Sequence, residues 1–130
     1  SMEICAEAPG YRNDWKSDIT LWVNGVDCGT YTSPGDFGDR RGRLTPAAWP
    51  NGATQYGEQV IWEISTDGCF INGIKANTAE GMLQDLELMN NRYLTVRIGN
   101  KEDALYNGGF NIFGRNFGDY DQDIILTIEY

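Results

Sequence analysis

The chain has 130 residues, of which 41% are hydrophobic and 22% charged, a composition typical of one folded domain. Its net charge of −9 argues against direct binding to nucleic acid or to an anionic membrane, because both need a surface rich in lysine and arginine. The complete absence of histidine excludes histidine-based catalysis and most zinc sites. No apolar run approaches the roughly 20 residues that a membrane-spanning helix requires.

The remaining chemistry gives little support to an enzyme. No phosphate-binding glycine loop is present. A glycosidase pair of carboxylates, although chemically sufficient, cannot be selected among 19 acidic residues. We therefore expect no catalytic residue, no bound metal and no cofactor. The cysteines, Cys5, Cys28 and Cys69, match no zinc-site spacing and are expected to be buried, reduced thiols of a cytoplasmic protein, with one disulfide plus a free thiol as the alternative.

The clearest local prediction is a hairpin over residues 18–31. Apolar residues stand at every second position from Ile19 to Val23, and the pair Asn24-Gly25 follows them. Asn-Gly is the strongest short hairpin signal, because both central positions of the favoured turn need a positive φ. A first strand is expected before this hairpin, over residues 2–8.

Residues 32–57 show neither strand nor helix periodicity. They contain three prolines, five glycines, three arginines and two aspartates. This composition predicts one long ordered loop, which Phe37, Leu44, Trp49 and Tyr56 would fold back onto the body of the domain. Loops of this length inside a compact domain are usually functional or disordered.

Strand patterns resume after the long loop and continue to the end of the chain. They predict strands at 60–65, 69–72, 94–98, 110–113 and 124–130, turns at 66–68 and 72–73, and a short helix within 77–91. The expected fold class is all-β, a single domain over residues 1–130. Its architecture is expected to be a two-sheet antiparallel β-sandwich of jelly-roll type with one long ordered loop and at most one short helix.

Two charged, glycine-rich loops supply most of the candidate ligand-binding residues. We expect them to lie together, because loops at one end of a sandwich cluster. Guanidinium groups are forked donors and carboxylates are acceptors, a combination suited to the vicinal hydroxyls of a sugar. The alternative is that these charges pair with each other and hold the loops in shape. The candidates are Asp36, Asp39, Arg40, Arg41 and Arg43 in the first loop, and Arg115, Asn116, Tyr120 and Gln122 in the second.

Trp22 and Arg97 complete the candidate site. Trp22 lies opposite the apolar face of its strand, and Arg97 shares a strand face with Tyr93 and Thr95. A tryptophan beside an arginine is a plausible stacking floor for a sugar ring. The competing interpretation is ordinary half-buried packing under a covering loop.

Asp119, Asp121 and Asp123 resemble half of a calcium loop. The later glutamate and the central glycine of an EF-hand are absent, so the pattern is weak. Acidic residues that precede an apolar strand also discourage aggregation at its edge. We therefore predict no metal site here and keep calcium as the alternative.

Five runs of residues resemble the C-terminal domain of a group of ArsR-like winged-helix transcriptional regulators from Gram-positive bacteria. The resemblance covers nearly the whole chain, and its second and last runs are the most specific. The runs are 18–25 (Asp-Ile-Thr-Leu-Trp-Val-Asn-Gly), 32–42 (Thr-Ser-Pro-Gly-Asp-Phe-Gly-Asp-Arg-Arg-Gly), 55–57 (Gln-Tyr-Gly), 96–99 (Val-Arg-Ile-Gly) and 113–124 (Phe-Gly-Arg-Asn-Phe-Gly-Asp-Tyr-Asp-Gln-Asp-Ile).

The resemblance implies a β-sandwich that senses an effector, a small molecule or a saccharide, or that assembles a cytoplasmic regulator as a homodimer. DNA would be bound only through an N-terminal domain that this sequence lacks. Ser1-Met2 is typical of the remnant left by tag removal, so a longer natural protein is expected. A carbohydrate-binding module of a glycoside hydrolase and a purely structural dimerisation domain remain as alternatives.

Overall fold

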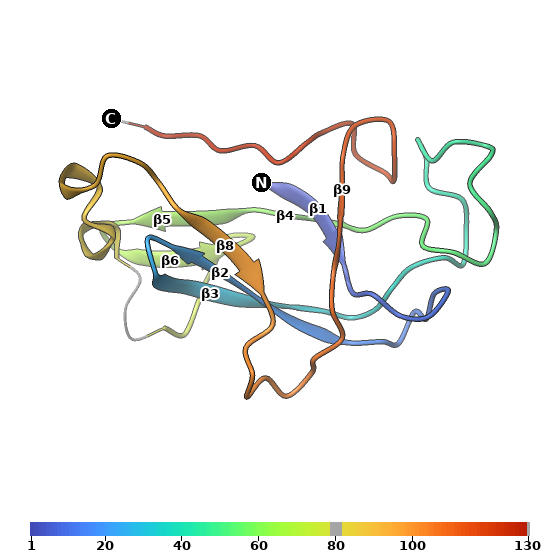
Figure 1. The fold of residues 1–130 in the computed structure, drawn as a ribbon, viewed down its shortest axis with the longest axis horizontal. Helices are drawn as coiled ribbons and strands as arrows, with labels where there is room; N and C mark the ends of the chain where they lie inside the picture. Colours follow the sequence, from blue (N-terminus) through green and yellow to red (C-terminus); the bar gives the residue numbers. More distant parts are fainter. Residues whose placement is uncertain (79–81, 130) are drawn as a thin grey trace.

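The computed structural model describes residues 1–78 and 82–129. Its regular structure is mostly strands, arranged in three small antiparallel sheets of three strands each, with a short 3-10 segment (Figure 1). The predicted all-β class is confirmed. The two-sheet jelly-roll arrangement is not confirmed, because the strands are short and divide among three sheets.

The first sheet has the order β4-β1-β9, formed by β4 (Glu58–Val60), β1 (Met2–Cys5) and β9 (Asn111–Phe113). All four residues of β1 are buried. Ile4 lies opposite Glu58 on one side and Ile112 on the other. The first residues of the chain therefore join its middle to its C-terminal part.

The second sheet has the order β3-β2-β8, formed by β3 (Val26–Ser33), β2 (Ser17–Val23) and β8 (Val96–Gly99). The predicted hairpin is confirmed as β2 and β3. Asn24 has a φ of 49° and Gly25 a φ of 79°, the positive values that a tight hairpin turn requires.

The third sheet consists of β5 (Trp62–Ser65), β6 (Gly68–Ile71) and β7 (Ile74–Lys75), in that order. Asn72 and Gly73 connect β6 to β7 with φ values of 48° and 81°, so this predicted turn is also confirmed. The short β7 follows it directly.

The single strand predicted over residues 60–65 is wrong, because the chain changes sheets at Ile61. β4 pairs with β1, whereas β5 pairs with β6. Asn72 holds the crossing: its amide oxygen accepts from the Ile61 nitrogen at 2.8 Å, and its own nitrogen donates to the Ile61 carbonyl at 2.9 Å. The alternation of side chains continues through this point, which is why the pattern resembles one strand.

The predicted helical segment consists of two 3-10 turns, η1 (Leu83–Leu86) and η2 (Leu88–Asn90). Glu87 separates them in the left-handed conformation, with a φ of 51°, which interrupts a helical path. Residues 79–81 of this prediction lie outside the described residues. No helix in the described part of the chain is long and apolar enough to cross a membrane.

The strand predicted over residues 124–130 is not formed within the described chain. Residues 124–129 are assigned to no strand, and Tyr130 lies outside the described residues. The sequence has the right alternation, but within the described residues its main chain pairs only at Ile125, which exchanges two hydrogen bonds with Ser1 and forms no longer ladder.

The core is divided into three clusters rather than one. All three cysteines are buried and form no disulfide, as predicted, and they contribute to two of the clusters. One cluster joins the hairpin to β6 and η1, the second lies between β1, β2 and β4, and the third supports the long loop. Their buried members are Leu21, Val23, Cys28, Cys69 and Leu86; Met2, Ile4, Ile19 and Val60; and Cys5, Phe37 and Phe113.

Candidate functional site

The long loop (residues 34–57) and the second loop (residues 114–123) lie side by side, as predicted from their composition. Both occupy the right-hand end of the molecule in Figure 1. The Leu44 nitrogen donates to the Gly118 carbonyl at 2.7 Å, and the Gly118 nitrogen donates to the Thr45 hydroxyl at 3.1 Å. These contacts join segments that are more than 70 residues apart in the chain.

A buried carboxylate fastens both loops to β1. Glu3 has no exposed surface, yet no cation pairs with it within the described residues. Its two oxygens instead accept from the main-chain nitrogens of Gly57 at 2.8 Å, Asp119 at 2.9 Å and Tyr120 at 3.0 Å. A buried carboxylate is tolerated when its oxygens accept several hydrogen bonds, so these amides hold it in place.

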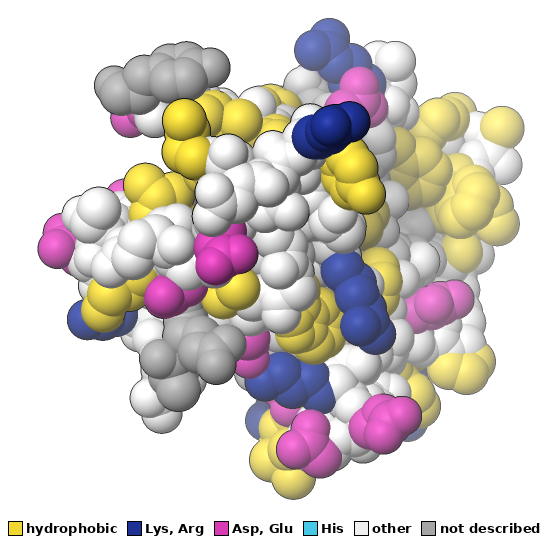
Figure 2. All heavy atoms as spheres, turned by 60° about the vertical axis from the view of Figure 1, so that its left-hand side comes forward, with side chains coloured by type: hydrophobic (Ala, Val, Ile, Leu, Met, Phe, Trp, Pro, Cys, Tyr) yellow, Lys and Arg dark blue, Asp and Glu magenta, His cyan; other side chains and the backbone are white. Residues whose placement is uncertain are grey.

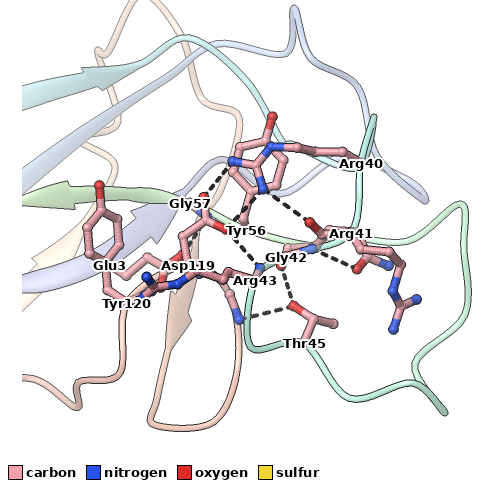
Figure 3. Close-up of polar contacts among 12 residues, drawn as sticks. Glu3, Arg40, Arg41, Gly42, Arg43, Thr45, Tyr56, Gly57, Asp119 and Tyr120 are labelled. Carbon is pink, nitrogen blue, oxygen red and sulfur yellow. Dashed lines mark hydrogen bonds and ion pairs between the residues drawn. The ribbon is translucent and has the colours of Figure 1, made fainter.

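An arginine on the long loop makes a two-pronged contact with the second loop. The Arg40 guanidinium donates to both oxygens of Asp119, at 2.6 and 3.0 Å, and lies 3.7 Å from the centre of the Tyr56 ring (Figure 3). The Asp119 carboxylate also accepts from the Arg43 nitrogen at 3.0 Å. Paired hydrogen bonds of this kind fix orientation as well as distance.

The pKa directions agree with this geometry. The hydrogen bond from Arg40 lowers the pKa of Asp119, and the same bond raises the pKa of Arg40. Burial and a 2.6 Å hydrogen bond to Asp39 raise the pKa of Tyr56 to about 12, while this bond lowers the pKa of Asp39. Both partners of the Arg40–Asp119 pair are therefore charged at neutral pH.

Arg41 organises the far part of the long loop. Its guanidinium donates to the main-chain carbonyls of Pro46 and Trp49 and to the side-chain oxygen of Asn51. These contacts use its donors inside the loop. Arg41 therefore positions residues 46–51 rather than facing outward as a free ligand contact.

Asp36 is fully buried and is satisfied internally. Its carboxylate accepts from the Ala8 nitrogen at 2.8 Å and from the Thr54 hydroxyl at 2.7 Å. Burial is the largest cause of its raised pKa. The structure therefore assigns Asp36 to holding the long loop, and we leave it out of the candidate ligand surface.

A hollow of about 320 Å³ opens beside these loops, between residues 49–54 and β9. Trp49 is 41% exposed and Ile112 is 38% exposed, so both offer apolar surface to a bound molecule. Thr54 and Asn111 lie at the same place, with the Thr54 hydroxyl donating to Asp36 and the Asn111 amide nitrogen donating to the Ala6 carbonyl. The complete lining is Trp49, Thr54, Asn111, Ile112, Phe113, Gly114 and Phe117.

Trp49 is held rigidly at the wall of this hollow. Its indole nitrogen donates to the Thr54 carbonyl at 2.8 Å, and its ring contacts the Phe117 ring edge-to-face, with centres 5.1 Å apart. Arg41 binds the Trp49 carbonyl from behind. A ring fixed before binding loses little conformational freedom when a ligand arrives.

Trp22 and Arg97 do form the predicted pair, but not at the loop cluster. They lie opposite each other on β2 and β8, with the Arg97 guanidinium 4.8 Å from the Trp22 ring centre. Figure 1 places β8 and the β2–β3 turn in the left half of the molecule, whereas the loops lie on the right. The two residues therefore do not supply the floor of the loop site.

The remaining predicted residues all lie on the loops, with different surroundings. Gln122 is buried and bonds to Gln59 at 2.6 Å and to Ser1 at 3.1 Å. Arg115 pairs loosely with Asp123, at 3.5 Å. Three predicted residues have exposed side chains that form no hydrogen bond with another described residue: Arg43, Asn116 and Tyr120.

The calcium alternative gains no support from the structure. Asp119 faces Arg40 and Asp123 faces Arg115, so two of the three carboxylates are already paired with cations. Within residues 1–78 and 82–129, no group of three acidic or cysteine residues is arranged to hold a metal ion.

Sequence reasoning missed the main surface of the hollow. Trp49 was expected to pack the loop against the body, and Ile112, Asn111 and Phe117 were assigned no role in binding. The available sign was a tryptophan between two prolines, Pro46 and Pro50, in the long loop. A second hollow, of about 520 Å³, lies at η1 and η2, but its wall comes almost entirely from that one segment.

When the chain was compared with protein-family models, curated proteins and solved structures, none matched. The similarity to the ArsR-like regulators therefore stays a prediction from the sequence.

Proposed function

We propose that this chain is a non-catalytic binding domain that senses a small polyhydroxylated effector, a mono- or oligosaccharide, for a cytoplasmic transcriptional regulator. The aromatic hollow beside the interlocked loops is the observation that carries this proposal. The regulatory part rests on the sequence resemblance, with DNA contacted through a separate N-terminal domain. A jelly-roll sandwich is part of the same proposal.

The lining of the hollow favours a sugar. Sugars present flat faces of C–H groups that pack on aromatic rings; Trp49 exposes such a ring, and Ile112 exposes an aliphatic side chain beside it. Thr54 and Asn111 line the same hollow; because the Thr54 hydroxyl donates to Asp36 and the Asn111 amide nitrogen donates to the Ala6 carbonyl, they offer a ring hydroxyl acceptor oxygens. A net charge of −9 disfavours a polyanionic ligand.

The charged residues around the hollow act as its frame in this proposal. Glu3 and Arg41 bind main-chain groups of the long loop, and Arg40 binds Asp119 of the second loop. These contacts hold the aromatic wall in one conformation. A rigid frame suits a sensor, because binding energy is then not consumed in ordering the loops.

A thermal-shift screen against neutral mono- and oligosaccharides tests the proposal. A ligand that binds only the folded chain raises its stability by about 2.7 kcal/mol at 100 times its Kd. Titration of the best ligand into Trp49→Ala should then show a loss of about 2 kcal/mol, or roughly thirtyfold in Kd.

Trp22→Ala is the matched control, because Trp22 is a second partly exposed tryptophan and lies on the opposite half of the molecule. It should bind as the parent does. Equal weakening in both variants, or loss in Trp22→Ala alone, would refute the assignment to the hollow. The absence of any stabilising sugar would refute the ligand class.

A further inference from the structure

The C-terminal segment (residues 124–129) is an extended chain that alternates like a strand but lies in no sheet. It runs along the upper edge of the molecule in Figure 1 and passes close to the N-terminus, just before β1. Ile124, Leu126 and Ile128 are 55%, 63% and 56% exposed. Figure 2 shows hydrophobic side chains uncovered near the top of the molecule, at the height of this segment.

One reciprocal contact establishes which way the main-chain groups of the segment point. The Ser1 nitrogen donates to the Ile125 carbonyl at 2.8 Å, and the Ile125 nitrogen donates to the Ser1 carbonyl at 2.9 Å. This exchange is that of a hydrogen-bonded pair in an antiparallel ladder. Ile125 therefore turns both of its main-chain groups toward the Ser1 side.

Main-chain groups alternate between the two edges of an extended chain. Thr127 and Glu129 thus turn toward the same side as Ile125, whereas Leu126 and Ile128 turn toward the outer edge. Within the described residues, no hydrogen bond is made by the main chain of residues 126–129. The outer edge is consequently an open template of donors and acceptors with branched apolar side chains along it.

We propose that this outer edge pairs with the outer edge of a second copy of the chain, antiparallel across a two-fold axis at Thr127. Leu126 of each copy then lies opposite Ile128 of the other, as a hydrogen-bonded pair, and the two Thr127 side chains face each other. With a two-fold axis, the same segment of each copy forms both sides of the interface.

The sequence of the segment favours a second copy of the same segment as the partner at its outer edge. In this register, apolar residues at 126 and 128 meet apolar residues, and threonine meets threonine, a favourable cross-strand pair. Glu129 lies opposite Ile125, so no like charges are opposed. This matters because each copy carries a net charge of −9, and pairing at a charged edge would meet repulsion.

Sedimentation equilibrium over a range of concentrations tests the dimer. The parent chain should reach twice its mass of 14.6 kDa. Ile128→Pro removes a donor that points to the outer edge, one in each copy, and should weaken dimerisation about tenfold or more. Glu129→Pro, the matched control, removes a donor that points to the other edge and should dimerise like the parent.

Hydrogen exchange supplies a second readout that does not depend on proline. As the concentration of the parent chain rises, the amides of Leu126 and Ile128 should exchange more slowly, whereas those of Thr127 and Glu129 should not. A chain that stays monomeric, or two proline variants that behave alike, would overturn the proposal. Protection of all four amides would place the partner on both edges and also overturn it.

Discussion

Replacing Glu3 with glutamine tests whether the buried carboxylate holds the two loops. Oε1 accepts from the nitrogens of Asp119 and Tyr120, and Oε2 accepts from those of Gly57 and Asp119. In glutamine, the amide nitrogen would replace one of the two carboxylate oxygens. It would then meet at least one main-chain N–H with another N–H, so that a hydrogen bond is lost and a donor is left buried.

The magnitude follows from the contacts. A hydrogen bond to a charged group contributes about 1.5–3 kcal/mol, and a buried unsatisfied group costs about 1–3 kcal/mol. We expect Glu3→Gln to lower the free energy of unfolding by about 3 kcal/mol. With about 2.1 cal/mol/K of unfolding entropy per residue over 130 residues, this corresponds to a fall in Tm of about 11 °C.

Urea and thermal unfolding, followed by circular dichroism, measure this change. Glu63→Gln is the control, since Glu63 is an exposed strand residue and the same substitution there should change stability by less than about 0.5 kcal/mol. If Glu3→Gln melts within about 2 °C of the control, the loops do not depend on this carboxylate and the argument is refuted.

Three further predictions concern the glycines, the buried acid and the thiols. Gly118→Ala should lower the free energy of unfolding in urea far more than Gly52→Ala does. Both glycines have φ near +80°, but a Cβ at Gly118 would overlap the Glu3 carboxylate, whereas a Cβ at Gly52 would meet open space. Equal losses of stability would show that only the backbone conformation matters. Because the pKa of Asp36 is raised in the folded chain, its contribution to stability is complete below its unfolded pKa of about 3.9 and is lost as the pH rises through its folded pKa. The parent should therefore lose stability over that pH window relative to Asp36→Asn. A stability difference between the two that does not change with pH would contradict the prediction. Burial raises the pKa of all three thiols, to about 12 for Cys5 and Cys69. Ellman's reagent at pH 8 should therefore label none of them until denaturant is added. Rapid labelling of the folded chain would show that Cys5, Cys28 and Cys69 are not buried as described.

The features predicted correctly depend on short stretches of sequence. Asn24-Gly25 sets a hairpin turn through its own backbone preferences, so no knowledge of distant residues was needed. The proximity of the two loops followed from their shared glycine-rich, charged composition. The alternative that Asp36 and Asp39 hold the loop in shape agrees with their hydrogen bonds from Thr54 and Tyr56, although neither aspartate pairs with Arg41 as that alternative expected.

The features that were missed depend on contacts between distant residues. Glu3 stands in an apolar strand, but its partners are main-chain nitrogens, which every sequence possesses and no side-chain pattern reveals. The change of sheet at Ile61 depends on Asn72, eleven positions away. Trp49 becomes an exposed wall only because Arg41 and Thr54 fix the loop around it.

The long reach of the Glu3 contacts also constrains the order of events during synthesis. Glu3 is made before all three of its partners, two of which lie 116 and 117 positions later. At about 5–20 residues per second, a ribosome delivers those partners roughly 6–23 s after β1. During that interval the Glu3 carboxylate can accept a hydrogen bond only from the Gly57 nitrogen, 54 positions after it, so the long loop can reach β1 before the second loop does. The hollow, whose wall includes β9 and Phe117, is therefore completed only after the residues of the hairpin and the third sheet have been made.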